Sequence, residues 1–232
     1  DTNGLYLVSV DVAAAQMTEE IVLQLVTGEG AYTPVSYTIR DYAQYILTGN
    51  YSNEIKTLVK HMLNYGAAAQ TYFGVKTGDL ANAGNGIDYT AQLPEQYVEA
   101  AISGQIQGVQ AYATTLVLNS KVAVRYYFTA DSLDGLSFSA NGVPYSAKSS
   151  QNMLYVEVSG IAPHDYDDAI TLIAKKGDEE LEITYSPLTY MVRMSQKGNA
   201  KLKPLINAMY GYYEAATAYV DSAVFSVVSG KW

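Results

Sequence analysis

The sequence contains no cysteine, one tryptophan and four phenylalanines. Without cysteine the chain can form neither a disulfide nor a thiolate metal site, and it has no thiol nucleophile. Its 14 basic and 23 acidic residues give a net charge of −9, which disfavours nucleic acid as a partner because like charges repel. No apolar run approaches the roughly 18 residues of a transmembrane helix, so we do not expect membrane insertion.

What the sequence does contain is enough apolar surface for a folded core. Of its 232 residues 49% are hydrophobic and 16% are charged, a balance that excludes disorder of the whole chain. The length suggests one or two domains. The 22 tyrosines are typical of rings that lie half-buried with the hydroxyl in water.

The sequence also repeats itself. Residues 5–26 align without a gap onto residues 154–175, at an offset of 149. The recurring residues are Leu5 and Leu154, Tyr6 and Tyr155, Ala13 and Ala162, Ile21 and Ile170, and Leu23 and Leu172. At offsets of 148 and then 147 the pairs are Tyr37 and Tyr185, Leu58 and Leu205, Met62 and Met209, and Tyr65 and Tyr212. The matching residues occur in the same order in both parts, and the offset between them changes only from 149 to 147. This pattern predicts two homologous units.

Each unit is predicted to consist of strands followed by a helical pair. The expected strands are Leu5–Val12, Ile21–Val26 and Tyr32–Tyr37, with counterparts at Leu154–Ile161, Ile170–Ala174 and Leu181–Tyr185. Short helices are expected over Ile39–Leu47 and Pro187–Ser195. Longer helices should begin after Ser52 and Asn199, with Gly74 as the stop of the first. Small residues on both long helices should allow close approach of a neighbouring element.

The second unit has strands that the first lacks. Thr114–Leu118, Val122–Phe128 and a hairpin around Asn141-Gly142 have no counterpart before residue 5. We therefore expect the first unit to be truncated at its N-terminus, with an open sheet edge that the rest of the chain or a partner covers.

The predicted fold class is α+β, with two homologous units that each comprise an antiparallel β-sheet or sandwich followed by a helical pair. The expected organisation is a partial first unit at 1–74, a Gly/Ala/Asn-rich connection at 75–112, a second unit at 113–220 and a tail or linker at 221–232.

Several stretches of the chain resemble a Tyr/Ala-rich repeat module of large secreted or wall-attached surface proteins of Gram-positive gut bacteria. The resemblance covers nearly the whole chain and includes YTIRDYAQYILTGNYSNEIKTLVKHMLNYGAAAQTYFG at 37–74, LVLNSKVAVRYYF at 116–128 and LEITYSPLTYM at 181–191. It implies an extracellular or wall-attached setting beside neighbouring domains of a parent protein, and it brings no catalytic residues. Some surface proteins of these bacteria bind immunoglobulins as superantigens.

Few residues suggest catalysis or metal binding. His61 on the first long helix and His164 in a turn have no partner at metal-ligand or triad spacing. Asp165-Tyr166-Asp167-Asp168 offers oxygen ligands for calcium, but the twelve-residue loop with its distal Glu is missing, which favours a solvated turn. The sequence has no GxSxG, no P-loop and no GxGxxG after a strand. We expect no enzyme, no catalytic residue, no metal and no cofactor.

A candidate binding surface lies on the strand Val122–Phe128. Strand alternation places Arg125 and Tyr127 together, opposite Val124 and Tyr126. Arginine beside tyrosine on an exposed face is typical of interface hot spots, although ordinary surface decoration of a strand explains it as well. Tyr145 and Tyr155 are further exposed candidates by position.

These observations favour a non-catalytic extracellular binding or adhesion module of a bacterial surface protein. The expected partner is a host extracellular protein, with an antibody as one candidate and sheet-edge pairing as one route. A carbohydrate-binding module of a polysaccharide-degrading system is the alternative, which the single Trp at position 232 disfavours. A passive structural spacer is the third interpretation.

Overall fold

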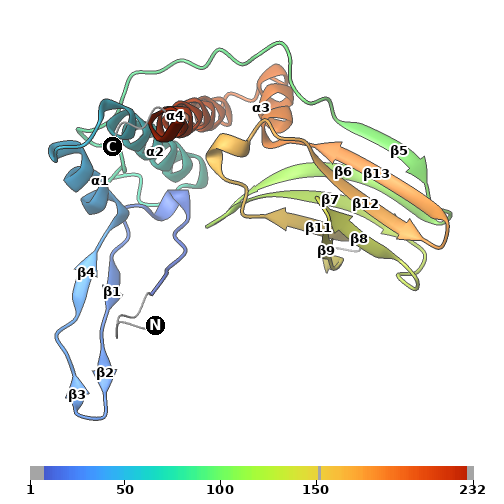
Figure 1. Cartoon of the computed structure of the whole chain (residues 1–232), viewed down its shortest axis with the longest axis horizontal. Coiled ribbons are helices and arrows are strands. Elements are labelled where there is room, and N and C mark those ends of the chain that lie inside the picture. Colours follow the sequence, from blue (N-terminus) through green and yellow to red (C-terminus); the bar gives the residue numbers. More distant parts are fainter. Residues whose placement is uncertain (1–7, 151–152, 229–232) are drawn as a thin grey trace.

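In a computed structural model of the chain, long helices lie at one end and a β-sandwich at the other (Figure 1). The structure describes residues 8–150 and 153–228. The helices are α1 (Ile39–Thr48), α2 (Asn53–Phe73), α3 (Pro187–Gln196) and α4 (Lys203–Val228), and two 3₁₀ turns are η1 (Ala14–Gln16) and η2 (Pro163–Asp165). Antiparallel sheets together with these helices confirm the predicted α+β class.

Two antiparallel sheets form the sandwich. The four-stranded sheet has the order β10-β11-β7-β6, and the five-stranded sheet has the order β5-β13-β12-β8-β9. The strands of the first are β6 (Val109–Leu118), β7 (Val122–Ala130), β10 (Lys148–Ser150) and β11 (Met153–Ser159). Those of the second are β5 (Ala101–Gln105), β8 (Ser137–Ala140), β9 (Val143–Tyr145), β12 (Ile170–Lys176) and β13 (Glu179–Tyr185).

Side chains from both sheets fill the core of the sandwich. On β7 the alternation predicted from the sequence buries Tyr126 and Phe128. The ring of Phe128 lies 5.1 Å from that of Phe138 on the opposite sheet, measured between centroids. The Tyr126 hydroxyl donates a 2.7 Å hydrogen bond to the carbonyl oxygen of Ile170, so a polar link between the two sheets is satisfied within the core.

Replacing Tyr126 by phenylalanine is expected to lower the free energy of unfolding by about 1–3 kcal/mol, because the buried carbonyl of Ile170 loses its donor. The matched control is Tyr112→Phe, since Tyr112 on β6 is 69% exposed and its change should stay within about 0.5 kcal/mol. Urea unfolding of both variants measures the difference. Equal stabilities of the two variants would contradict the assigned role of the hydroxyl.

Most predicted helix boundaries hold because capping residues stand where the apolar periodicity begins and ends, but α4 begins at Lys203 and not directly after Asn199 as predicted. The Ser52 side chain accepts a hydrogen bond from the amide of Ile55 at the start of α2. Gly74 ends α2 in the left-handed conformation, with φ 73°. At the start of α3, the Ser186 side chain accepts from the amide of Thr189. Local chemistry alone therefore specifies these ends.

The long helices α2 and α4 pack against each other, as their small residues suggested. A Cβ atom on Gly211 of α4 would lie 2.6 Å from Nδ1 of His61 on α2, so the contact requires glycine. The rings of Tyr65 and Tyr212 stack in the same interface, with centroids 5.9 Å apart. The structure thus joins the first and second parts of the chain through their helices.

A two-stranded arm projects from the helices, away from the sandwich (Figure 1). It consists of β1 (Ile21–Leu23), β2 (Val26–Thr27), β3 (Gly30–Ala31) and β4 (Val35–Tyr37). In the described part of the chain β1 pairs only with β4, and β2 only with β3. We call residues 21–37 the arm.

The arm and the β12–β13 hairpin have the same register. Ile21 lies opposite Tyr37 in the arm, and their counterparts in the sequence alignment, Ile170 and Tyr185, lie opposite each other in the sandwich. The turns before the two hairpins also correspond. In the first part the amide of Arg40 donates to the Met17 carbonyl at 3.1 Å, and in the second the amide of Leu188 donates to the Tyr166 carbonyl at 2.8 Å.

The predicted strand Leu5–Val12 is not formed over residues 8–12, and residues 5–7 lie outside the described residues. Its counterpart β11 pairs with β7 and β10, whereas no described strand pairs with residues 8–12. Without a neighbour to accept its backbone hydrogen bonds, a lone strand has no stabilising partner. Among the described residues before α1, strand pairing is therefore limited to the arm.

Two boundaries differ from the predicted organisation. The expected connection at 75–112 contains β5 and the first residues of β6, and β5 pairs with β13 in the five-stranded sheet. Strand β5 shows no clear alternation, so its identity comes from pairing rather than from local pattern. The expected tail at 221–232 begins as helix, because α4 runs to Val228.

Candidate functional site

The four-stranded sheet carries a cluster of charged and aromatic side chains on its outer face. Neighbouring registers assemble it, since Arg125 on β7 pairs with Glu157 on β11, and Tyr127 pairs with Tyr155. We call these four residues the outer-face cluster. All four are partly exposed, whereas Tyr126, which lies between Arg125 and Tyr127 on β7, is buried in the core.

The outer-face cluster is held by its own contacts. Nε of Arg125 donates to Oε2 of Glu157 at 2.5 Å, and Nζ of Lys148 lies 3.9 Å from Oε1 of the same carboxylate. The Arg125 guanidinium lies 4.7 Å from the centroid of the Tyr155 ring, within range of a cation–π interaction. The cluster is thus ordered before any partner arrives, which lowers the entropic cost of binding.

Three of the four residues predicted to bind come together here, and Tyr145 does not. It lies on β9 opposite Phe138, half-buried and packed against the sandwich core. The face that Tyr145 shares with Phe138 is the inner face of the five-stranded sheet. Its position in the sequence alone did not reveal this, because the side of a short strand depends on the sheet it joins.

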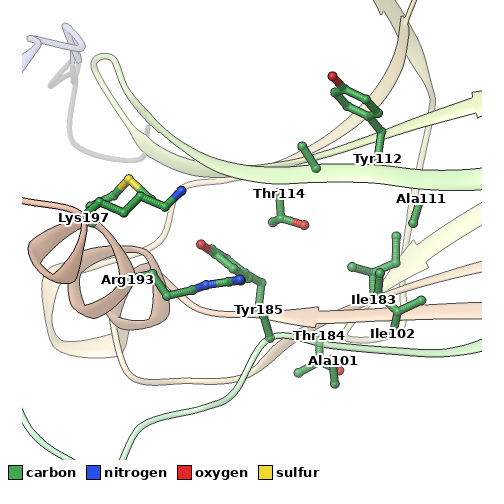
Figure 2. Close-up of a pocket in the computed structure, with 13 residues that line it drawn as sticks. Ala101, Ile102, Ala111, Tyr112, Thr114, Ile183, Thr184, Tyr185, Arg193 and Lys197 are labelled. Carbon is green, nitrogen blue, oxygen red and sulfur yellow. The ribbon is translucent and has the colours of Figure 1, made fainter.

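A cleft of about 470 Å³ opens between β5, β6, β13 and α3. Figure 2 shows Arg193 of α3 beside Tyr185 at one end and Ile102 with Ile183 at the other. Thr114 points from β6 toward Tyr185. The cleft therefore combines an apolar wall with a cationic end.

The cationic end is unusual in a chain with net charge −9. Arg193 lies in the last turn of α3 and Lys197 directly follows its last residue. Both are exposed, and no aspartate or glutamate is among the residues that line the cleft. Burial raises the pKa of Tyr185, and the positive charge of Arg193 opposes that rise. The sequence analysis did not single out these residues, although Arg193 on the predicted helix Pro187–Ser195 is followed by a second cation four positions later, which was a usable signal.

The arm carries many exposed apolar side chains. Each of its large apolar residues other than Ile21 exposes at least 45% of its surface. These residues are Val22, Leu23, Leu25, Val26, Tyr32, Val35 and Tyr37. Exposed apolar side chains gathered on one short segment indicate a site of interaction.

The structure places His164 in an exposed turn and buries His61 between the two long helices. His164 Nε2 lies 3.2 Å from Oδ1 of Asp165 in an exposed turn. His61 is buried between α2 and α4, its ring edge-on to Tyr89 at 4.9 Å between centroids. Within the residues that the structure describes, no three His, Asp or Glu side chains are placed to hold a metal ion.

Acidification is expected to destabilise the fold through His61. Burial lowers the pKa of its imidazole below the ordinary 6.5, and Glu214 on α4 opposes this shift. The unfolded chain therefore binds the proton more readily than the folded chain, and stability is lost as the pH falls through about 6.5. Urea unfolding between pH 7.5 and about 5 measures this loss. His61→Asn should flatten the profile in that window, and an unchanged profile would contradict the role of His61.

Comparisons with known proteins give no family for this chain. No protein-family model, no curated protein sequence and no solved structure matches it. Within the described residues no helix is both long and apolar enough to cross a membrane. The function must therefore be argued from the surfaces of the molecule itself.

Proposed function

We propose that the chain is a non-catalytic extracellular binding module of a bacterial surface protein, and that its outer-face cluster engages a host protein. The observation that carries this proposal is the assembly of Arg125, Tyr127 and Tyr155 on one exposed sheet face. Tyrosine and arginine are enriched at the energetic centres of protein interfaces. The ion pair with Glu157 fixes the arginine in place.

The geometry of the two tyrosines supports a protein rather than a sugar as the partner. Their ring planes are inclined by 42°, with centroids 5.6 Å apart. Two rings at this angle do not form the planar platform on which consecutive sugar rings stack. They suit instead the polar, partly wet centre of a reversible protein interface.

The extracellular setting and the repeated organisation belong to the same proposal. The equal registers of the arm and of the β12–β13 hairpin, and the equivalent hydrogen bonds before them, support two homologous units. The resemblance to surface-protein modules of Gram-positive gut bacteria supports secretion or wall attachment. Among host extracellular proteins, an antibody is the partner that this resemblance favours.

The experiment measures binding of the purified chain to immobilised serum and mucosal proteins, with immunoglobulins included, and to plant and mucin polysaccharides. Arg125→Ala and Tyr127→Ala are expected to weaken protein binding at least about tenfold each. Tyr42→Ala is the matched control, because Tyr42 is 52% exposed on α1, away from the cluster. If neither panel retains the chain, the passive spacer is favoured. If all three changes weaken protein binding equally, the outer-face cluster is not the binding site.

The cleft favours a second candidate function, binding of an acidic glycan. Its two cations could pair with a sugar carboxylate, while Ile102 and Ile183 line the opposite end. In the same assay Arg193→Ala combined with Lys197→Ala should then abolish retention by carboxylated polysaccharides and leave protein binding intact. Retention of neutral polysaccharides alone would contradict this candidate.

A further inference from the structure

One side of the arm carries apolar side chains whose counterparts on β12 and β13 are buried in the core of the sandwich. Leu23 is 53% exposed and Val35 is 66% exposed. Their counterparts Leu172 and Ile183 are 1% and 5% exposed. The difference arises because β12 and β13 lie against the four-stranded sheet, whereas no described strand lies against the arm.

The edges of the arm are open as well. In the sandwich, β12 also pairs with β8, and β13 also pairs with β5. The outer edges of β1 and β4 have no such neighbour among the described residues. Natural sheet edges are commonly protected by lysine or proline, yet residues 21–37 contain no Lys or Arg and only Pro34. Strand edges that pair with a neighbouring strand typically have this composition.

We propose that the arm is the docking surface for a second β-layer of the kind formed by residues 101–150, presented by another unit of the same type. Such a layer would contribute strands like β5 and β8 to the two edges and a sheet like β6–β7 to the apolar side. This surface is separate from the outer-face cluster, so the proposal does not depend on host-protein binding.

Chemical and geometric matching supports this occupant. Ile21, Leu23 and Tyr37 are identical to Ile170, Leu172 and Tyr185, the residues that meet the layer in the sandwich. The pairing register of the two hairpins is the same, so the arriving layer meets the same spacing of side chains. An intact second copy of the chain does not offer this layer, because its own β12–β13 already covers it.

The experiment adds a second copy of the β-layer to the N-terminal side of the arm. A copy of residues 99–152 is placed directly in front of residue 4, a junction that reproduces the alignment of Asn152 with Asn3. We expect the added residues to fold and to resist proteolysis. Leu23→Asp should then lower the midpoint of thermal unfolding by more than about 4 °C in the extended chain, and by less than about 2 °C in the chain alone.

A matched control separates docking on the apolar side from general damage to the arm. Val22 faces away from that side, like its counterpart Thr171, so Val22→Asp should shift the midpoint in the extended chain by less than half as much. A second extended chain with Leu25→Ala and Val35→Ile carries two of the sandwich's own residues in the arm. If the added layer stays protease-sensitive in both extended chains, the proposal is wrong.

A second copy is the competing occupant. If the unextended chain dimerises at micromolar concentration and Leu23→Asp abolishes the dimer, the arm pairs with another arm and the proposal is overturned. A chain that remains monomeric in sedimentation, and whose extended form loses stability through Leu23→Asp, supports the proposal.

Discussion

Replacing Leu172 by alanine is expected to lower the free energy of unfolding by about 2–5 kcal/mol, whereas the same change at Leu23 should stay within about 0.5 kcal/mol. The two leucines are equivalent in the sequence alignment and hold equivalent positions in their hairpins. Leu172 is 1% exposed in the sandwich core, and its removal leaves a cavity. Leu23 is exposed, so its removal leaves none.

Urea unfolding of the two variants, followed by circular dichroism, measures this difference. Because both changes are Leu→Ala in strands of the same register, strand propensity cancels in the comparison. Similar losses at the two positions would show that the arm is covered in solution, either within the chain or by a second copy.

Replacing Gln70 by leucine is expected to lower the free energy of unfolding by about 2–6 kcal/mol, because the buried amide of Ala81 and the buried hydroxyl of Thr18 lose their partners at about 1–3 kcal/mol each. Gln70 on α2 is fully buried. Its Oε1 accepts from the amide of Ala81 at 2.8 Å, and its Nε2 donates to the carbonyl of Asp79 at 3.0 Å and to Oγ1 of Thr18 at 3.1 Å. One side chain thus holds the segment after α2 and the turn before the arm.

Gln44→Leu is the matched control for this prediction, because Gln44 is exposed on α1. Its change should remain within about 0.5 kcal/mol. Loss of stability at Gln70 should also raise hydrogen exchange of the Ala81 amide, which a purely apolar packing role would not require. A stable Gln70→Leu variant with an unchanged Ala81 exchange rate would refute the assigned network.

Local signals in the sequence were sufficient for α1, α2 and α3 and for the β8–β9 hairpin, whereas both ends of α4, which runs from Lys203 to Val228, differ from the prediction. Asn141 and Gly142 adopt φ values of 51° and 77°, as a two-residue turn between β8 and β9 requires. The N-cap Ser52 and the stop Gly74 lie where the prediction put them. These features depend on residues within a few positions of one another, so periodicity and capping chemistry determine them.

Features that depend on distant partners were not predictable in the same way. Strand β5 has a weak pattern of its own and is recognised only by its pairing with β13. The inward orientation of Tyr145 and the cationic cleft at Arg193 require the placement of whole sheets. The outer-face cluster was accessible in part, since alternation along β7 needs no tertiary information, whereas its partner Glu157 comes from a neighbouring strand.

The two exposed surfaces differ in chemistry, and the difference indicates separate roles. The arm is apolar and its outer edges pair with no strand that the structure describes, which suits a lasting interface that resembles a divided core. The outer-face cluster is polar and aromatic, which suits reversible recognition. Under the two proposals, the arm joins one unit to the next and the outer-face cluster binds a host protein.

Hydrogen exchange of the arm tests the central claim, that the arm is one half of an incomplete sandwich. In the chain alone, amides of β1 and β4 are expected to exchange at least about 100-fold faster than those of β12 and β13, since local opening of an uncovered hairpin costs little. In the chain extended by residues 99–152 the two hairpins should exchange at similar slow rates. Slow exchange of the arm in the unextended monomer, or fast exchange in the extended chain, would contradict the account.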